Sequence, residues 1–120
     1  MPSVLIVDDD TDLLEMVDLV LSNAGMNANC IYDAATLFDS VTHIRPDIVV
    51  MDVFLGEQDG RSLCYSLKTS ENFKDIPIIL YSAGIISGES VRNALADAFL
   101  IKPFNIHALI AKIKELTIKN

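Results

Sequence analysis

Basic residues are scarce in this sequence. Its 120 residues include 17 acids but only 9 lysines and arginines, which gives a formal net charge of −8. Nucleic acids and anionic membrane surfaces attract proteins through basic patches. We therefore expect no direct binding to nucleic acid and no attachment to a membrane surface.

Long apolar runs are also missing. No basic N-terminal stretch leads into a long apolar segment, and the longest apolar runs have only the length of a strand. No repeat, low-complexity tract or interdomain linker is visible. With 51% apolar and 22% charged residues, the composition is that of a compact domain. We expect one domain over residues 1–120, in the cytoplasm.

Cysteine is rare. Cys30 and Cys64 are the two cysteines, and their spacing is not that of a metal site. In a reducing compartment such residues are most simply buried thiols, and a redox pair is the less favoured alternative.

What the sequence does contain is an alternation of short β-branched runs and helical periods. Five strands are expected, at Ser3–Val7, Asn27–Tyr32, Ile48–Met51, Pro77–Tyr81 and Ala98–Ile101. Helices are expected at Leu13–Ala24, Ala34–Thr42, Gly60–Lys68, Ser87–Ala96 and after the cap Asn105. The segment Phe54–Asp59 is expected to be a loop. This βα repeat predicts a three-layer α/β sandwich, (βα)5, with a five-stranded parallel sheet of flavodoxin-like order 2-1-3-4-5.

Carboxylates follow two of these strands directly. The run Val4–Val7 leads into Asp8 and Asp9, and Ile48–Met51 leads into Asp52. In the predicted strand order the first and third strands are neighbours, so these acids meet at one sheet edge, where α/β proteins bind ligands. Crowded carboxylates need a cation, and Mg²⁺ is the expected one. Each acid alone is also explained as a helix cap or a turn residue.

The ends of the fourth and fifth predicted strands carry Ser82 and Lys102. Two carboxylates that hold a metal, a third that acts as a nucleophile, a hydroxyl and an ammonium together suit the handling of a phosphoryl group. The combined pattern resembles the receiver domain of two-component response regulators along the whole chain. The resemblance rests on Val4–Asp10, Met51-Asp52, Asp59-Gly60, Tyr81-Ser82-Ala83 and Phe99–Phe104.

The resemblance implies a role for each residue of the site. Asp52 would be the phosphoacceptor. Asp8 and Asp9 would hold Mg²⁺ together with an Asp52 oxygen and the backbone carbonyl of Phe54. Lys102 would pair with the phosphoryl group.

The resemblance also implies a switch. Ser82 stands at the position of the switch hydroxyl, and Phe99 at that of an aromatic residue that changes rotamer on activation. The Lys102–Pro103 peptide bond is expected to be cis. The surface formed by the fourth helix, fifth strand and fifth helix would then change.

The implied partners are a sensor histidine kinase or phosphotransfer protein and a downstream protein target. An effector domain of the same protein would replace that target if the chain is a fragment. The domain would catalyse only its own phosphorylation and dephosphorylation. A Mg²⁺-dependent aspartyl phosphatase is an alternative, but such enzymes usually carry a second acid where this chain has Phe54. A receiver that works without phosphorylation is disfavoured because all five polar site residues are present.

The sequence departs from the family pattern at several positions. Gly56 replaces the usual proline, which predicts a more mobile loop, and Leu95 replaces the usual glycine before the fifth strand. Ser82 and Lys102 lie 20 positions apart (102 − 82), which predicts a short or shifted fourth helix. Phe54 and Gly84, two residues beyond Asp52 and Ser82, offer no side-chain hydrogen bond to a hydrolytic water. We therefore expect a long-lived phosphoryl group.

Overall fold

The computed structural model describes residues 1–102 and 105–118. Among these residues, no helix combines the length and the apolar character needed to cross a bilayer. The expected cis bond between Lys102 and Pro103 lies outside the described residues.

The centre of the molecule is a parallel five-stranded sheet of order β2-β1-β3-β6-β7. In chain order its strands are β1 (Ser3–Val7), β2 (Asn27–Ile31), β3 (Ile48–Asp52), β6 (Ile78–Ser82) and β7 (Ala98–Ile101). The predicted order 2-1-3-4-5 is confirmed, because β6 and β7 are the fourth and fifth strands of this sheet.

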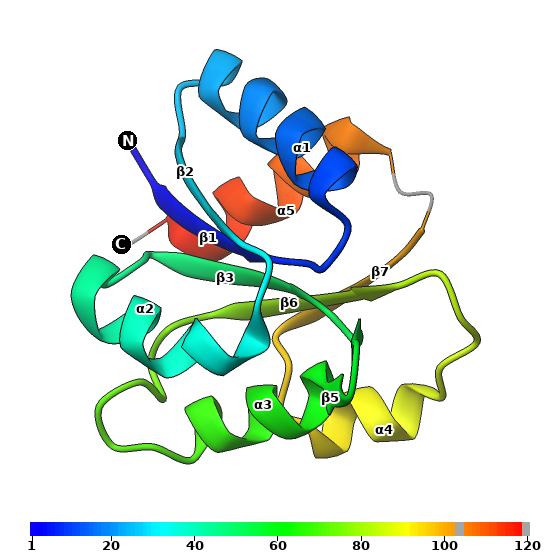
Figure 1. Ribbon diagram of the computed structural model, residues 1–120. Coiled ribbons are helices and arrows are strands. Elements are labelled where there is room, and N and C mark those ends of the chain that lie inside the picture. The colour runs from blue at the N-terminus through cyan, green and yellow to red at the C-terminus, as the bar shows by residue number, and fades with distance from the viewer. Residues whose placement is uncertain (103–104, 119–120) are drawn as a thin grey trace.

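Helices cover both faces of the sheet. They are α1 (Thr11–Asn23), a 3₁₀ turn (Ala34–Thr36), α2 (Leu37–Ile44), α3 (Gly60–Lys68), α4 (Gly88–Asn93) and α5 (Ile106–Thr117). In Figure 1, α1 and α5 lie on one side of the sheet, and α2, α3 and α4 lie on the other. The predicted three-layer sandwich is thereby confirmed.

Two apolar clusters hold these layers together. Successive residues of a strand point to opposite faces, so Val4 and Ile6 pack with α1 and α5, whereas Leu5 and Val7 pack with α2 and α3. All five residues of β3 are buried, as expected for a central strand. Each fully buried aliphatic side chain stabilises the fold by about 1.5–3 kcal/mol.

Polar caps fix where the helices begin. Asp10 caps α1, and its Oδ1 accepts hydrogen bonds from the backbone N–H of Asp12 (3.1 Å) and Leu13 (3.2 Å). Asn105 caps α5 through a bond from the His107 N–H (2.8 Å). The cap at Asn105 was expected from the sequence, and each such cap contributes ~1 kcal/mol.

The segment expected as a loop is instead a short antiparallel hairpin. β4 (Phe54–Leu55) pairs with β5 (Gln58–Asp59) across the two-residue turn Gly56-Glu57. Gly56 has φ 65°, the conformation that glycine adopts at the first position of a tight hairpin turn. Glycine at this position therefore allows an ordered turn.

The two thiols differ in exposure, which corrects one expectation. Cys64 is buried, and burial raises the pKa of its thiol to about 12. Cys30 is exposed, because it lies on the edge strand β2. Its Sγ lies 3.8 Å from the Leu14 carbonyl oxygen. The alternating pattern of β2 was too weak to show which of its residues face solvent.

The fourth helix is short, as the spacing predicted. It begins after the cap Ser87 and ends at Asn93, three residues before the expected end at Ala96. Leu95 follows with φ 66°, in the left-handed region that favours glycine. The chain therefore makes this turn with a strained, non-glycine residue.

Replacing Leu95 with glycine should stabilise the protein. The left-handed conformation costs a leucine about 1–2 kcal/mol, and the side chain is 45% exposed, so little packing is lost. We expect Leu95→Gly to raise the free energy of unfolding by about 0.5–1 kcal/mol in urea denaturation. Arg92→Gly, at an exposed position of α4, is the matched control and should destabilise by a similar amount. A loss of stability in Leu95→Gly would contradict the strain.

Candidate functional site

The carboxyl ends of β1, β3, β6 and β7 meet at one edge of the sheet. Val7 is in register with Met51, and Ser82 with Ile101, so the residues that follow these strands lie at one level. Asp8 and Asp52 are buried there, together with Ser82. The strand ends singled out in the sequence therefore form one cluster.

Asp8 is fully buried and receives three hydrogen bonds. Its Oδ1 accepts from the backbone N–H of Asp10 at 2.9 Å. Its Oδ2 accepts from the Tyr81 hydroxyl at 2.5 Å and from Lys102 Nζ at 3.0 Å. These donors satisfy most of the acceptor capacity of a carboxylate and fix the direction of the side chain.

Asp52 lies beside it, 6% exposed. Its Oδ1 accepts from the Phe54 N–H at 3.1 Å, and its Oδ2 accepts from Lys102 Nζ at 3.1 Å. Burial raises the pKa of Asp52 above its ordinary value, and the neighbouring Asp8 acts in the same direction. The bonds from Phe54 and Lys102 oppose this rise without cancelling it.

Lys102 links the two buried acids. Its ammonium forms ion pairs with Asp8 and with Asp52 and lies 4.7 Å from the centre of the Tyr81 ring. Burial alone would lower the pKa of Lys102, but the hydrogen bonds and charges of the two carboxylates outweigh it and raise the pKa. The cationic form of Lys102 is thus favoured at this position.

The acid cluster has the composition of a hard metal site. One carboxylate oxygen from each of Asp8, Asp9 and Asp52 lies within 4.8 Å of the other two, and Asp9 is exposed to solvent. Carboxylate oxygens in this number suit Mg²⁺, which retains several waters in proteins. The donor set therefore fits the expected ion.

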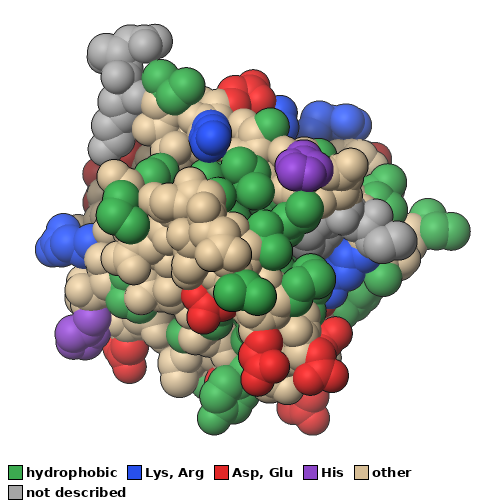
Figure 2. All heavy atoms as spheres, turned by 90° about the horizontal axis from the view of Figure 1, so that it is seen from above, with side chains coloured by type: hydrophobic (Ala, Val, Ile, Leu, Met, Phe, Trp, Pro, Cys, Tyr) green, Lys and Arg blue, Asp and Glu red, His purple; other side chains and the backbone are tan. Residues whose placement is uncertain are grey.

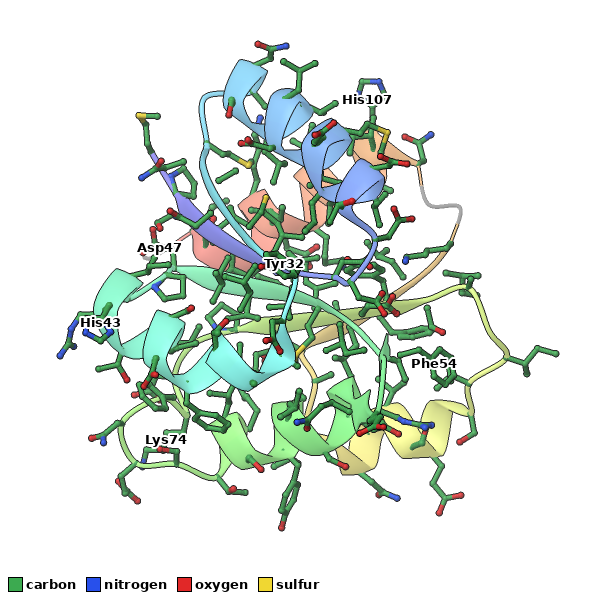
Figure 3. All side chains as sticks on the ribbon, in the orientation of Figure 1. Tyr32, His43, Asp47, Phe54, Lys74 and His107 are labelled. Atoms are coloured by element: carbon green, nitrogen blue, oxygen red, sulfur yellow. The ribbon has the colours of Figure 1, made fainter. Side chains whose placement is uncertain are left out.

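Phe54 and Gly84 lie together at the rim of the site. The labelled Phe54 in Figure 3 projects from β4, shortly after the end of β3, toward the connection between β6 and α4. An ideal Cβ at position 84 would lie 3.0 Å from Phe54 Cε2, so the ring rests against the bare backbone of Gly84. Half of the Phe54 side chain remains exposed.

The two residues assigned to the switch face the interior. Ser82 is fully buried, and its Oγ accepts the Gly84 N–H at 3.0 Å. Phe99 is partly buried and packs against the apolar cluster under α2 and α3. Ser82 therefore lies at the site, whereas Phe99 lies on the neighbouring strand β7, in register with Leu80.

Gly60 explains the Asp59-Gly60 motif. A Cβ at this position would lie 2.2 Å from the backbone oxygen of Asp52, which no side chain can accommodate. The Gly60 N–H donates to the Val53 carbonyl at 2.7 Å, and Asp59 caps α3. This close approach joins α3 directly to the end of the strand that carries Asp52.

Tyr81 is the site residue that the sequence analysis missed. The sequence analysis places it at the end of an apolar strand and within the Tyr81-Ser82-Ala83 motif but gives it no role, yet its hydroxyl reaches Asp8. Burial, followed by the bond to Asp8, raises its pKa far above the usual range, so the hydroxyl keeps its proton. A phenol at a buried position of an otherwise aliphatic strand was the available signal, because a buried hydroxyl needs a partner.

Acidic side chains continue from the site onto the surface. Figure 2, viewed from the side of α1 and α5, shows acids gathered toward one part of this face, with apolar side chains between them. Asp12, Glu15 and Asp18 are the exposed acids of α1. The two histidines, His43 and His107, lie apart from the site on exposed positions of α2 and α5 (Figure 3).

A parallel five-stranded α/β fold with paired acids, a hydroxyl and a lysine at its strand ends defines the class of aspartyl phosphoacceptor domains. The sequence matches the response regulator receiver domain over residues 4–114. The chain therefore belongs to this family, whose members are the phosphoacceptor modules of two-component signalling.

Known proteins agree with this assignment. Transcriptional regulatory protein PrrA of Mycobacterium leprae (strain TN) is 34% identical over 117 residues, which cover 96% of this chain and 49% of that protein. The chain thus spans about half the length of the curated relatives it matches. The Francisella response regulator 1452 receiver domain superposes with a TM-score of 0.86 at 28% identity, covering 98% of this chain and 97% of the other.

A further solved structure shares the fold. The receiver domain of sensor histidine kinase PA1611 from Pseudomonas aeruginosa PAO1 has a TM-score of 0.86 at 24% identity, covering 97% of each chain. That protein was solved with a magnesium ion coordinated in its active site cleft.

Removing the Asp9 carboxylate should show two separate effects, the repulsion among the three acids and their binding of Mg²⁺. Without metal, three carboxylates within 4.8 Å repel one another, so Asp9→Ala should raise the free energy of unfolding in EDTA by up to ~1 kcal/mol. The stabilisation that Mg²⁺ gives the wild type should be largely lost in this variant. Thermal unfolding with EDTA and with Mg²⁺ measures both effects.

Glu15→Ala is the matched control, because it removes an exposed acid farther along α1. It should keep the full Mg²⁺ response. An Asp9→Ala protein that responds to Mg²⁺ like the wild type would exclude Asp9 as a ligand.

Proposed function

We propose that residues 1–120 form a single receiver domain that accepts a phosphoryl group on Asp52. The observation that carries this proposal is the placement of Asp52. Its carboxylate is nearly buried at the end of β3, beside Asp8 and within 3.1 Å of the Lys102 ammonium. A nucleophile, a metal-binding acid pair and a fixed cation are the groups that phosphoryl transfer requires.

Transfer from a phosphohistidine donor needs one bond to form and one to break. An oxygen of the Asp52 carboxylate attacks phosphorus, the phosphorus–nitrogen bond breaks, and the donor imidazole leaves. The product on Asp52 is an acyl phosphate. Lys102 is already hydrogen-bonded to Asp52 Oδ2, so its charge is in place to stabilise the transferred group.

The acids of the cluster would hold Mg²⁺. Asp8, Asp9, an Asp52 oxygen and the Phe54 backbone carbonyl are the proposed ligands, and the bound ion would neutralise charge on the phosphoryl oxygens. Asp8 is held in direction by its three hydrogen bonds, whereas Asp9 is exposed and free to adjust.

Ser82 would respond to the negative charge of the phosphoryl group on Asp52. Its Oγ accepts from Gly84, so its own proton remains available for a charge-assisted bond to a phosphoryl oxygen. Movement of Ser82 would free space for Phe99, on the neighbouring strand β7, and alter the surface of α4, β7 and α5. Ile101, which is 67% exposed, lies on this surface.

We propose a sensor histidine kinase or a phosphotransfer protein as the phosphoryl donor. The altered surface would be recognised by a downstream protein target or by an effector domain of the same protein. The domain would catalyse only its own phosphorylation and dephosphorylation. A cytoplasmic location stays a prediction from the sequence.

Phosphorylation should occur on Asp52 and require Mg²⁺. Incubation with a small phosphoryl donor such as acetyl phosphate should raise the intact mass by one phosphoryl group, and EDTA should prevent it. Asp52→Asn should abolish the mass increase, because an amide cannot form the acyl phosphate. Asp47→Asn, an acid near the opposite end of β3, is the control and should be labelled like the wild type. Equal labelling of Asp52→Asn would refute the assignment.

The phosphoryl group should be long-lived because Phe54 shields it. Hydrolysis needs a water in line with the leaving carboxylate, and the Phe54 ring offers that water no hydrogen bond. We expect Phe54→Asn to accelerate decay by up to ~10²-fold after donor removal. Gly84→Glu should also accelerate it, since its side chain meets the Phe54 ring.

Phe54→Leu is the matched control for shielding. It keeps an apolar side chain at the rim, so decay should stay close to that of the wild type. Equal or slower decay in Phe54→Asn would show that the ring does not protect the acyl phosphate.

A further inference from the structure

Tyr81 connects the apolar core to the acid cluster. Its ring is buried on the α1–α5 side of the sheet, in the cluster that contains Leu109 and Ile113. Its hydroxyl emerges at the site edge and donates to Asp8 Oδ2 at 2.5 Å. The bond crosses the sheet, because β3 lies between the strands β1 and β6 that carry the two residues.

The bond to Tyr81 completes a three-point fixation of Asp8. A carboxylate has about four lone-pair positions. Donors from Asp10, Tyr81 and Lys102 occupy three of them, each from a different part of the chain. About one acceptor position is left, so the direction in which Asp8 can bind another group is set by these donors.

Tyr81 also contacts Lys102, which is another of the donors to Asp8. Lys102 Nζ lies 4.7 Å from the centre of the Tyr81 ring, within the range of a cation–π interaction. One side chain therefore orients both the buried acid and the ammonium that the acid shares with Asp52.

We infer that Tyr81 is a positioning residue that prepares Asp8 to bind Mg²⁺. This inference rests on the proposed function. The hydroxyl could act in two opposite ways, because it fixes the carboxylate but also draws electron density from it. We expect the fixing of the carboxylate to outweigh the loss of electron density, because hydrogen bonds to metal-binding carboxylates typically increase metal affinity by 10–100-fold.

The test is Mg²⁺ binding to Tyr81→Phe. This variant keeps the buried ring and its contact with Lys102 and removes only the hydroxyl. Isothermal titration with MgCl₂ should show an affinity at least ~10-fold weaker than in the wild type. Tyr65→Phe makes the same chemical change on the exposed face of α3 and should leave the affinity unchanged.

A second readout separates positioning from general stability. In acetyl phosphate reactions, the Mg²⁺ concentration for half-maximal labelling should rise by the same factor in Tyr81→Phe. The labelling rate at saturating Mg²⁺ should stay within about threefold of the wild type, because the hydroxyl acts through Asp8. If Tyr81→Phe does not fold, Tyr81→Met, an adaptable apolar replacement, is measured in the same way.

The outcomes distinguish the two proposals. Lower thermal stability with unchanged Mg²⁺ affinity would mean that the bond is only structural, and tighter binding would mean that electron withdrawal dominates; either result overturns the inference. Absence of Mg²⁺ binding by the wild type overturns it as well. If the affinity falls as expected but Asp52 is never labelled, the inference stands and the proposed function fails.

Discussion

The ammonium of Lys102, shared between two buried carboxylates, is the interaction on which this site depends. Asp8 and Asp52 are almost completely removed from water, and two like charges in that environment repel each other strongly. Lys102 bonds to both at about 3 Å and makes their burial possible. Removing the cation would leave two unpaired buried acids, so the site and the stability of the sheet edge are coupled through one side chain.

The strand order of the sheet brings these charged groups together. A parallel order with β1 beside β3 puts Asp8 and Asp52 on adjacent strand ends, and β7 brings Lys102 from 94 positions away in sequence. The apolar clusters on both faces hold this register. Gly60 then allows α3 to begin directly against the Asp52 backbone, which joins this helix to the strand end.

The sequence predicted most of this because buried parallel strands have an unmistakable apolar pattern and polar residues mark their ends. The features that the sequence did not predict depend on local geometry that leaves no periodic pattern. The hairpin at Gly56 consists of two-residue strands, which leave no periodicity to detect. The hydroxyl of Tyr81, on β6, bonds to Asp8, which follows β1, and β3 lies between these two strands. The exposure of Cys30 depends on how the edge strand β2 is covered. Leu95 occupies a backbone conformation that its own side chain disfavours, so propensity argued against the turn.

Charge balance would connect the metal site to the proposed switch. Three clustered carboxylates and one ammonium leave an excess of two negative charges, which is what a divalent cation compensates. Converting the Asp52 carboxylate into an acyl phosphate dianion would add one negative charge. The divalent cation and Lys102 together do not neutralise this additional charge. On the next strand, the hydroxyl of Ser82 is buried and its oxygen accepts the Gly84 N–H. Under the proposed function, its proton would be drawn toward the phosphoryl group, and the movement of Ser82 would free space for Phe99. In the proposed function, the added charge would therefore be converted into a rearrangement of side chains.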